Sequence, residues 1–389
     1  MSFSKKTIRD IDVAGKTVLV RASLNVPIKD GKVEDELRLK ASLPTLQYLI
    51  DQNAKLILIS HHSTEGQSLA PVAPVLSKLL NRPVEFLPDC IGPEVMAAAQ
   101  ALQPGQVLML ENLRFHKEEE ANDPEFAKQL AALAQIYVDD DFTTTHREHA
   151  SMVGVPKLLP AVAGFQIEHE VDTITKAMEN PKRPLLVVVG GAKIATKIDF
   201  LNNFLDKAQA MLIGGAMANT FLQAQGLNIG KSLTDEEDIP TAQKVMQQAR
   251  DNGVELFLPT DVVVTDDLDK ASNVRTVATN QIGVNDIVAD VGPQTVAQIQ
   301  SVLNQKGTVI WNGPLGVTET AAFAKESTDL AKRIIDSGAT SIIGGGDTAS
   351  FIDKLGWQDK FSFVSTGGGA SLELMSGKKL PAVEVLQDK

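Results

Sequence analysis

The chain has 389 residues, a formal net charge of −12 and a single cysteine, Cys90. This length exceeds what one hydrophobic core usually holds, so we expect two domains of similar size. The negative charge argues against a general nucleic-acid binder, and one cysteine excludes an intrachain disulfide framework or a multi-cysteine metal site. The N-terminus lacks a signal-like apolar run, and no segment approaches ~18 uninterrupted apolar residues. We therefore expect a cytoplasmic protein with no membrane span.

In the first half of the chain, short apolar runs alternate with helical patterns. The runs predict strands at 18–21, 56–60, 107–110 and 136–138, and the patterns predict helices at about 37–52 and 124–134. This alternation is typical of a parallel α/β domain.

Polar and basic residues recur just beyond these predicted strands. They are Arg21 and Asn25, His61 and His62, Arg114 and His116, and His146, Arg147 and His149. The carboxyl ends of parallel strands meet at one edge of a sheet, so this recurrence favours a single anion site. The ordinary alternative is a solvated basic surface.

Residues 164–180 have helical spacing, carry many charges and end at Asn180-Pro181, which predicts an interdomain helix. The α/β rhythm then resumes, with strands near 185, 211, 256, 287, 308, 341 and 362 and helices at 241–250 and 328–337. The second half is therefore predicted to be another doubly wound domain, and no fixed repeat of ~20–50 residues indicates a solenoid.

Four apolar runs in the second half end in glycine pairs or triplets that lead toward predicted helices. They end at Gly190-Gly191, Gly214-Gly215, Gly344-Gly345-Gly346 and Gly367-Gly368-Gly369. Such turns expose helix N-termini that favour phosphate, and Asp347 with Thr348 adds a magnesium ligand and a hydroxyl, so we expect one shared nucleotide crevice. The alternative is an ordinary turn in which Asp347 or Thr348 caps the helix.

Residues 226–232 are similar to a phosphate-binding P-loop, but three residues, not four, separate the first glycine from the Gly-Lys pair. We therefore expect a plain loop there. None of the glycine turns has the Gly-x-Gly-x-x-Gly fingerprint followed by a ribose-binding acid. This absence disfavours a dinucleotide-dependent oxidoreductase.

The order and spacing of motifs along nearly the whole chain resemble those of the phosphoglycerate kinase family. The second half carries Gly-Gly-Ala-Lys at 190–193, Gly-Ala-Met-Ala-Asn-Thr-Phe at 215–221, Trp-Asn-Gly-Pro at 311–314, Gly-Gly-Gly-Asp-Thr at 344–348 and Ser-Thr-Gly-Gly-Gly-Ala-Ser at 365–371. The first half carries Asn-Val-Pro at 25–27, Arg38, Leu-Glu-Asn-Leu-Arg-Phe-His at 110–116 and residues 144–151.

The resemblance implies two Rossmann-like domains that close about the helix between them. The acid-substrate domain would span 1–165, the helix 166–182 and the nucleotide domain 183–369, with a tail from about 370 to 389 packing back on the first domain. The implied reaction is reversible phosphoryl transfer from 1,3-bisphosphoglycerate to MgADP, giving 3-phosphoglycerate and MgATP, by a monomer. The alternative is a nucleotide-binding paralogue with weakened or lost kinase activity.

The resemblance also assigns site residues. On the nucleotide side they are Gly191, Ala192, Lys197, Gly215, Ala216, Asn312, Glu319, Gly344, Gly345, Gly346 and Thr348, with Asp347 as the Mg²⁺ ligand. On the acid side they are Ser23, Leu24, Asn25, Arg38, His61, His62, Ser63, Thr64, Arg114, His146 and Arg147. Arg38 and Lys193 would be the catalytic cations over the migrating phosphoryl group. From the residues alone, Lys193 and Lys197 also fit a pair on one exposed helical face.

Three departures from the family pattern lie on the acid side. Ser23 replaces a carboxylate, and residues 60–65 read Ser-His-His-Ser-Thr-Glu where the family has Ser-His-Leu-Gly-Arg-Pro, so an arginine is missing at Thr64. Residues 140–147 read Asp-Asp-Phe-Thr-Thr-Thr-His-Arg where the family has Asp-Ala-Phe-Gly-Thr-Ala-His-Arg, which loses a glycine and adds an acid. Losing one charged hydrogen bond costs ~1.5–3 kcal/mol, so we expect weakened binding of the acid.

Overall fold

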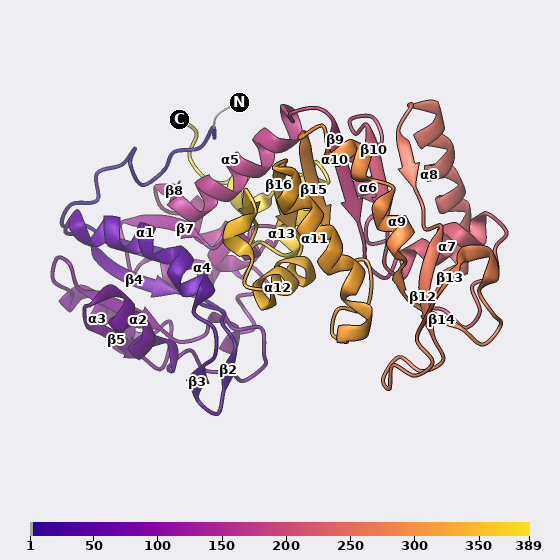
Figure 1. Cartoon of the computed structure of the whole chain (residues 1–389). Coiled ribbons are helices and arrows are strands. Elements are labelled where there is room, and N and C mark those ends of the chain that lie inside the picture. The colour runs from indigo at the N-terminus through magenta and orange to yellow at the C-terminus, as the bar shows by residue number, and fades with distance from the viewer. Residues whose placement is uncertain (1–2) are drawn as a thin grey trace. The chain divides into compact units, whose positions relative to one another are not determined.

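The computed structural model describes residues 3–389, and the chain divides into two compact units. One unit contains the residues up to Asp172 together with Lys379–Lys389, and the other contains Thr173–Lys378. Each unit is built on its own parallel six-stranded sheet (Figure 1), which confirms the predicted fold class. Within the described residues, no helix is both long and apolar enough to cross a membrane.

The sheet of the first unit has the spatial order β5(Val84–Leu87), β6(Val107–Leu110), β4(Lys55–Ile59), β1(Thr17–Ala22), β7(Ile136–Asp140), β8(Ala161–Ala163). The connection from β1 leads to β4 on one side, and the connection from β7 leads to β8 on the other. The carboxyl ends of β1 and β7 therefore form a switch point, where open α/β sheets bind ligands.

The remaining elements of this unit are α1(Leu37–Asp51), α2(Val72–Leu80), α3(Pro93–Ala101), α4(Pro124–Ala131), α14(Pro381–Glu384) and the hairpin β2(Ile28–Lys29), β3(Lys32–Val33). Helix α1 confirms the prediction for 37–52. Its apolar face packs on the sheet, with Leu39, Leu46 and Leu49 fully buried beside Val20 and Leu58. Burying one such leucine contributes about 1.5–3 kcal/mol.

The main sheet of the second unit has the order β11(Glu255–Phe257), β10(Ala210–Ile213), β9(Leu185–Val189), β15(Thr308–Asn312), β16(Thr340–Gly344), β17(Phe363–Val364). Counted along the chain this is the order 3-2-1-4-5-6, which is typical of dinucleotide-type folds and places the switch point between β9 and β15. The helices of this unit are α6(Ile198–Phe204), α7(Met217–Ala224), α8(Ile239–Asp251), α9(Pro293–Ala297), α10(Gln300–Leu303), α11(Lys325–Ser337), α12(Gly346–Lys354) and α13(Gly369–Met375).

Two predictions for this unit are wrong. The strand near 287 does not belong to the parallel sheet: β14(Ile287–Val291) pairs antiparallel with β12(Asp261–Thr265), which also pairs with β13(Arg275–Ala278) in a separate three-stranded sheet. Strands β12 and β13 were not predicted. A short apolar run has the same appearance in either kind of sheet, because only its long-range partner differs. The turn at Gly190 also leads into a loop, since α6 begins only at Ile198.

Helix α5(Phe165–Glu179) confirms the helix predicted at 164–180 and crosses the boundary between the units. Its first turn is fixed within the first unit, where the Gln166 N–H donates to Asp140 Oδ1 at 2.9 Å and the Phe165 N–H donates to Thr45 Oγ1 at 2.8 Å. A Cβ at Gly164 would lie 2.1 Å from Asp140 Oδ1, so this entry into the helix requires glycine.

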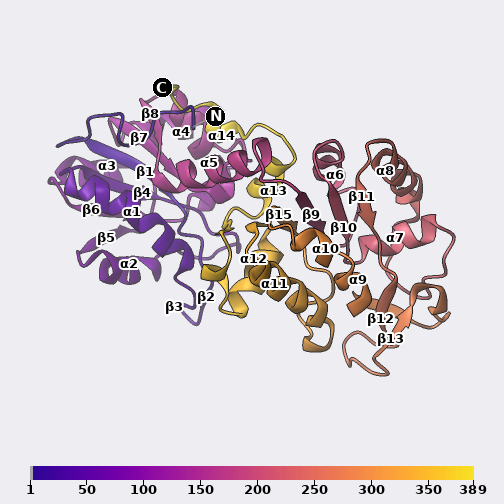
Figure 2. The same ribbon diagram turned by 45° about the horizontal axis from the view of Figure 1, so that its top comes forward.

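The end of the chain lies beside its beginning in the first unit (Figure 2). Lys5 Nζ lies 2.7 Å from Asp388 Oδ1, and Ala382 packs against Met152 and Val153. Helix α13 belongs instead to the second unit, where Asn203 Nδ2 donates to the Met375 carbonyl at 2.7 Å. The segment that returns to the first unit therefore begins at Lys379 in this structure.

Candidate active site

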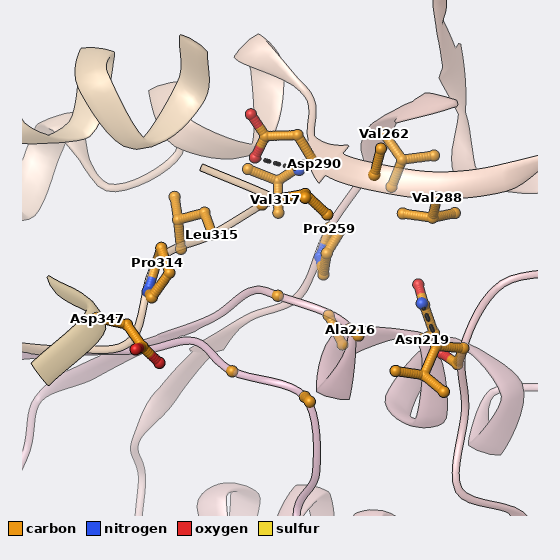
Figure 3. Close-up of a pocket in the computed structure, with 18 of the residues that line it drawn as sticks. Ala216, Asn219, Pro259, Val262, Val288, Asp290, Pro314, Leu315, Val317 and Asp347 are labelled. Atoms are coloured by element: carbon orange, nitrogen blue, oxygen red, sulfur yellow. Dashed lines mark hydrogen bonds between the residues drawn. The ribbon is translucent and has the colours of Figure 1, made fainter. Parts of the chain in front are cut away.

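A cavity of about 280 Å³ lies in the second unit at the carboxyl ends of β9 and β15. The turns after β9 and β10 form one wall with Gly191, Ala192, Gly215 and Ala216. The antiparallel sheet and the loop after β15 form the opposite wall, and Asp347 lies at one end (Figure 3). An apolar slot with polar groups at one end suits a flat heterocycle that carries phosphates.

Two of the four glycine turns, at 190–191 and 214–215, line this cavity, and Asp347, which follows the turn at 344–346, lines it as well; no residue of the turn at 367–369 does. The predicted residues on its wall are Gly191, Ala192, Gly215, Ala216, Glu319 and Asp347. The wall formed by Pro259, Val262, Val288 and Ala289 was not predicted, because these residues lie on or just before strands of a second sheet whose strand pairing is not visible in local sequence.

The glycines at these turns bring backbones together. A Cβ at Gly190 would lie 1.9 Å from the Pro314 carbonyl oxygen, and a Cβ at Gly215 would lie 2.4 Å from the Gly191 nitrogen. These glycines thus let the backbones of neighbouring turns lie in contact.

Beside the cavity lies a group of polar atoms suited to phosphate. Lys197 Nζ donates to Asn312 Oδ1, and Asn312 Nδ2 is buried with no hydrogen-bond partner among residues 3–389. Burial lowers the pKa of Lys197 to about 8, although the nearby Asp347 carboxylate opposes this shift. An unsatisfied buried donor next to a desolvated cation is a costly arrangement that an anion would relieve.

The start of α12 overturns the capping alternative. Its N-cap is Gly345, at φ 92°, which has no side chain to cap the helix, and the Gly345 N–H donates to Ser371 Oγ at 3.2 Å and not to Asp347 or Thr348. The Asp347 side chain is exposed on the first turn and is available to a ligand. The Thr348 hydroxyl is buried and accepts the Gly313 N–H at 2.7 Å, so it ties the loop after β15 to α12. Gly344, Gly345 and Gly346 shape this turn without lining the cavity.

Lys193 lies in the loop before α6 and not on a helix, so the alternative of a helical Lys193–Lys197 pair is wrong. Its side chain is 59% exposed, and Nζ lies 3.7 Å from Asp235 Oδ2. A long, exposed cation on a loop can reorient toward a bound phosphoryl group at small cost.

In the first unit, the residues after β1, β4 and β7 meet around Arg21, as the recurrence of basic residues predicts. Arg21 is fully buried and donates to Asp141 Oδ2 at 2.8 Å, to Ser151 Oγ at 3.1 Å and to His61 Nδ1 at 2.8 Å. Its donors are used within the protein, so Arg21 organises this edge of the sheet and leaves the anion to other residues.

Two histidines at this edge, His61 and His149, do not supply positive charge. Burial and the neighbouring Arg21 lower the pKa of His61 well below its usual value. Burial and Arg114 lower the pKa of His149 to about 4. For His61 and His149, the prediction that histidines contribute to a cationic edge is therefore wrong.

The loop at 61–64 is fastened to the segment after β1. His62 Nε2 donates to the Val26 carbonyl at 2.9 Å and its Nδ1 accepts the Thr64 N–H at 3.1 Å, while Asn25 Nδ2 donates to Ser63 Oγ at 2.7 Å. His62 thus holds the loop and is not a free substrate ligand. The Leu24 side chain is fully buried in the core, so its predicted place among the substrate contacts is wrong for the side chain.

Three arginines remain for the anion. Arg38 is half-buried and donates to the Asn25 carbonyl at 2.6 Å, Arg114 Nε lies 3.0 Å from Glu120 Oε1, and Arg147 is exposed. His146, in the segment after β7, is half-buried. Arg38 and Arg114 keep most of their guanidinium donors for another acceptor, because the contacts with the Asn25 carbonyl and with Glu120 each use only one nitrogen.

The acidic run after β7 adds less charge than its sequence indicates. Burial, followed by Asp141, raises the pKa of Asp139 well above its usual value, and burial raises the pKa of Asp140 to about 8. Burial opposes ionisation of Asp141 as well, but Arg21 and His61 bring its pKa below the usual value. At neutral pH, Asp141 is therefore the charged member of the run.

A base-sized slot at the switch point of one parallel sheet, with arginines at the switch point of another, defines a two-domain phosphotransferase. The family model described as phosphoglycerate kinase matches residues 8–378. A curated phosphoglycerate kinase from Moorella thermoacetica is 46% identical over 392 residues, covering 99% of this chain and 100% of that protein. One from Synechococcus sp. is 47% identical over 397 residues, covering 97% and 96%.

Solved structures agree with these relatives. The phosphoglycerate kinase of Coxiella burnetii matches with a TM-score of 0.88 and 41% identity, and that of Pyrococcus horikoshii with a TM-score of 0.85 and 30% identity. Each match covers 98% of this chain and 98% of the other. The chain belongs to the phosphoglycerate kinase family and is a kinase with that activity; no finding favours the alternative of a paralogue that has lost it.

Proposed function

We propose that the chain transfers the acyl phosphate of 1,3-bisphosphoglycerate directly and in line to MgADP, giving 3-phosphoglycerate and MgATP. The observation that carries the proposal is the phosphate end of the cavity in the second unit. There an unsatisfied Asn312 amide, a desolvated Lys197 and an available Asp347 carboxylate lie at one end of an apolar slot. Phosphoryl transfer needs positioning and fixed charge and no protein nucleophile.

In this proposal the adenine occupies the slot between the glycine turns and the antiparallel sheet, with Gly191, Ala192, Gly215 and Ala216 on one side. Glu319, which lines the cavity, accepts hydrogen bonds from the ribose hydroxyls. Asn312 and Lys197 bind phosphate oxygens. The N-terminal turn of α12, entered through Gly345, adds backbone N–H groups and a favourable dipole.

The residues present also fit the magnesium ion that the family generally needs. Asp347 is an exposed carboxylate on the cavity wall, and carboxylate oxygen is the ligand that Mg²⁺ prefers. When bound, the ion would neutralise phosphate charge as it develops. The chain contributes to this by holding Asp347 on the rigid first turn of α12.

On the first unit, we assign the acid to the edge formed by the ends of β1, β4 and β7. Asn25, Arg38, His61, Ser63, Arg114, His146 and Arg147 are the proposed contacts, with Ser23 and Thr64 supplying no charge. Arg38 and Lys193 serve as cations over the migrating phosphoryl group. Direct transfer needs reacting atoms ~3–3.5 Å apart, so we propose that the units close about α5 during turnover.

The decisive experiment is a steady-state assay in both directions with 3-phosphoglycerate and MgATP, or 1,3-bisphosphoglycerate and MgADP, each titrated. We expect activity in both directions, with an ordinary KM for MgATP and a raised KM for 3-phosphoglycerate. Light scattering of the same preparation should give the mass of one chain. Absence of transfer by a folded sample that binds MgADP would reject the reaction while leaving the nucleotide site intact.

A further inference from the structure

A chain of three buried side chains crosses the edge of the first sheet. Asp141 and Arg21 are fully buried, and His61 is 5% exposed. Arg21 Nη1 donates to Asp141 Oδ2 at 2.8 Å, and Arg21 Nη2 donates to His61 Nδ1 at 2.8 Å. The two hydrogen bonds use the two different terminal nitrogens of one planar guanidinium. The Asp141 carboxylate therefore fixes the orientation in which Arg21 donates to the His61 imidazole.

This geometry determines which imidazole nitrogen carries the proton. A guanidinium has only donors, so His61 Nδ1 must accept and the ring proton must sit on Nε2. His61 Nε2 forms no hydrogen bond to any residue in the described part of the chain. His61 therefore presents an N–H donor without carrying charge.

The charged and titratable groups around His61 come from four segments. Arg21 lies on β1, Asp141 follows β7, Arg114 follows β6, and His149 lies in the segment beyond Asp141. Arg21, Arg114 and His149 oppose protonation, and Asp141 favours it. Burial also opposes protonation, so Asp141 is the one group among these that favours the charged imidazole.

Asp141 is the carboxylate that Arg21 contacts directly. The other hydrogen-bond partners of Arg21, Ser151, Ser60, His61 and the Ala22 carbonyl, are neutral, and the buried Glu119 lies one hydrogen bond further away, on Ser151. A buried arginine without a carboxylate is strongly unfavourable and would turn toward another acceptor or admit water. Either response would release His61 Nδ1 and let the imidazole change its tautomer.

The position of Asp141 also explains how this edge of the sheet keeps a carboxylate although residue 23 is a serine. Strands β1 and β7 pair in parallel up to Ala22 opposite Asp140, and Ser23 and Asp141 are the next residues on the two segments. The Ser23 hydroxyl is buried and has no hydrogen-bond partner among residues 3–389. One carboxylate thus serves this pair of positions, and it comes from the segment after β7.

We propose that Asp141 is a positioning residue for the acid substrate: by holding Arg21, it keeps His61 in the tautomer whose Nε2–H donates to an oxygen of that substrate. The proposal rests on the proposed function only for the identity of the acid. The internal arrangement of Asp141, Arg21 and His61 is independent of any ligand.

The first test needs no variant. Nitrogen-15 spectra of histidine-labelled wild-type protein should show His61 protonated at Nε2 and bare at Nδ1 between pH 5.5 and 8, with no titration near 6.5. A ring protonated at Nδ1, or one that titrates near 6.5, would overturn the proposal. This result does not depend on activity, so it separates the proposal from the proposed function.

The second test compares Asp141→Asn with wild type and with Asp141→Glu, each checked for a cooperative melt. Asp141→Asn should mix the two His61 tautomers and raise KM for 3-phosphoglycerate about tenfold or more, with KM for MgATP unchanged. Asp141→Glu should restore part of the loss. An equal rise in both KM values would indicate a general structural defect, and unchanged His61 signals or an unchanged acid KM would exclude positioning; any of these results rejects the proposal.

A third variant keeps the test informative if Asp141→Asn unfolds. The double change Ser23→Asp with Asp141→Ser returns one carboxylate to the same pair of strand ends from the β1 side. It should fold, retain the His61 Nε2–H signal and bind the acid better than Asp141→Ser alone. If the double variant is no better than the single one in both respects, the carboxylate is not serving His61 through Arg21, and the proposal fails.

Discussion

The nucleotide half-site and the acid half-site satisfy their polar groups in opposite ways. In the second unit, Asn312 Nδ2 has no partner in the described chain, Lys197 is desolvated and Asp347 is exposed. In the first unit, Arg21 is neutralised by Asp141, and Arg114 is paired with Glu120. The buried cation of the first unit is therefore compensated inside the protein, whereas the buried cation and amide of the second unit would be relieved by an anion. A bound anion should therefore gain more from Lys197 and Asn312 than from Arg21.

The largest effect should come from Arg38 and Lys193, the cations that we propose act on the phosphoryl group. Arg38→Ala and Lys193→Ala are each expected to lower kcat by ~10²-fold or more while changing nucleotide affinity little, because these charges act mainly in the transition state. Stopped assays and calorimetry measure the two quantities. Lys40→Ala, an exposed change on α1, is the matched control. A change confined to KM would contradict the catalytic role.

The next effect concerns Asp347. Asp347→Ala should remove most of the magnesium dependence of ADP binding, a loss of ~10–100-fold in the presence of Mg²⁺, because one charged ligand bond disappears. Calorimetry with and without Mg²⁺ measures this loss of affinity. Asp353→Ala, which removes an exposed carboxylate elsewhere on α12, is the control. If magnesium still strengthens ADP binding as in wild type, Asp347 is not the ligand.

An effect of similar or smaller size is expected from rebuilding the acid half-site. Giving residues 61–65 the family sequence His-Leu-Gly-Arg-Pro should lower KM for 3-phosphoglycerate, up to ~10-fold, by adding a charged donor. Ser23→Asp alone should not help, because it would set a second carboxylate beside Asp141 at the same strand level. Adding both Ser23→Asp and Asp141→Ala to the rebuilt loop should lower KM for 3-phosphoglycerate further, because only one carboxylate then stands at these two positions. A folded, rebuilt protein without improved affinity would mean that the acid is held elsewhere.

The smallest effect is a pH dependence confined to the nucleotide half-site. The pKa of Lys197 is lowered to about 8, so the lysine is cationic below that pH and loses its charge as pH rises through it. Bound phosphate favours the cation, so ADP affinity should fall several-fold between pH 7.5 and 9. Lys197→Arg should bind ADP with little pH dependence over this range, since arginine stays charged. A wild-type affinity that is flat to pH 9 would contradict the predicted role of Lys197.

Local sequence determined the parts of this protein that depend on neighbours along the chain. The apolar runs and helical spacing predicted most parallel strands, α1 and α5, and the glycine turns predicted the ligand edge of the second sheet. Motif order then indicated the family. These features were readable because strand burial, helix periodicity and turn conformation are encoded within a few residues of each other.

Tertiary structure alone decided what those residues do. It assigned the strand near 287 to an antiparallel sheet that forms a wall of the nucleotide cavity, and it turned Gly190 and Gly215 into contacts between backbones. It also made His61 neutral and paired Arg21 with Asp141, residues 120 positions apart. Strand partners, burial and charge state depend on which distant segments meet, and a pattern of neighbouring residues carries no information about that.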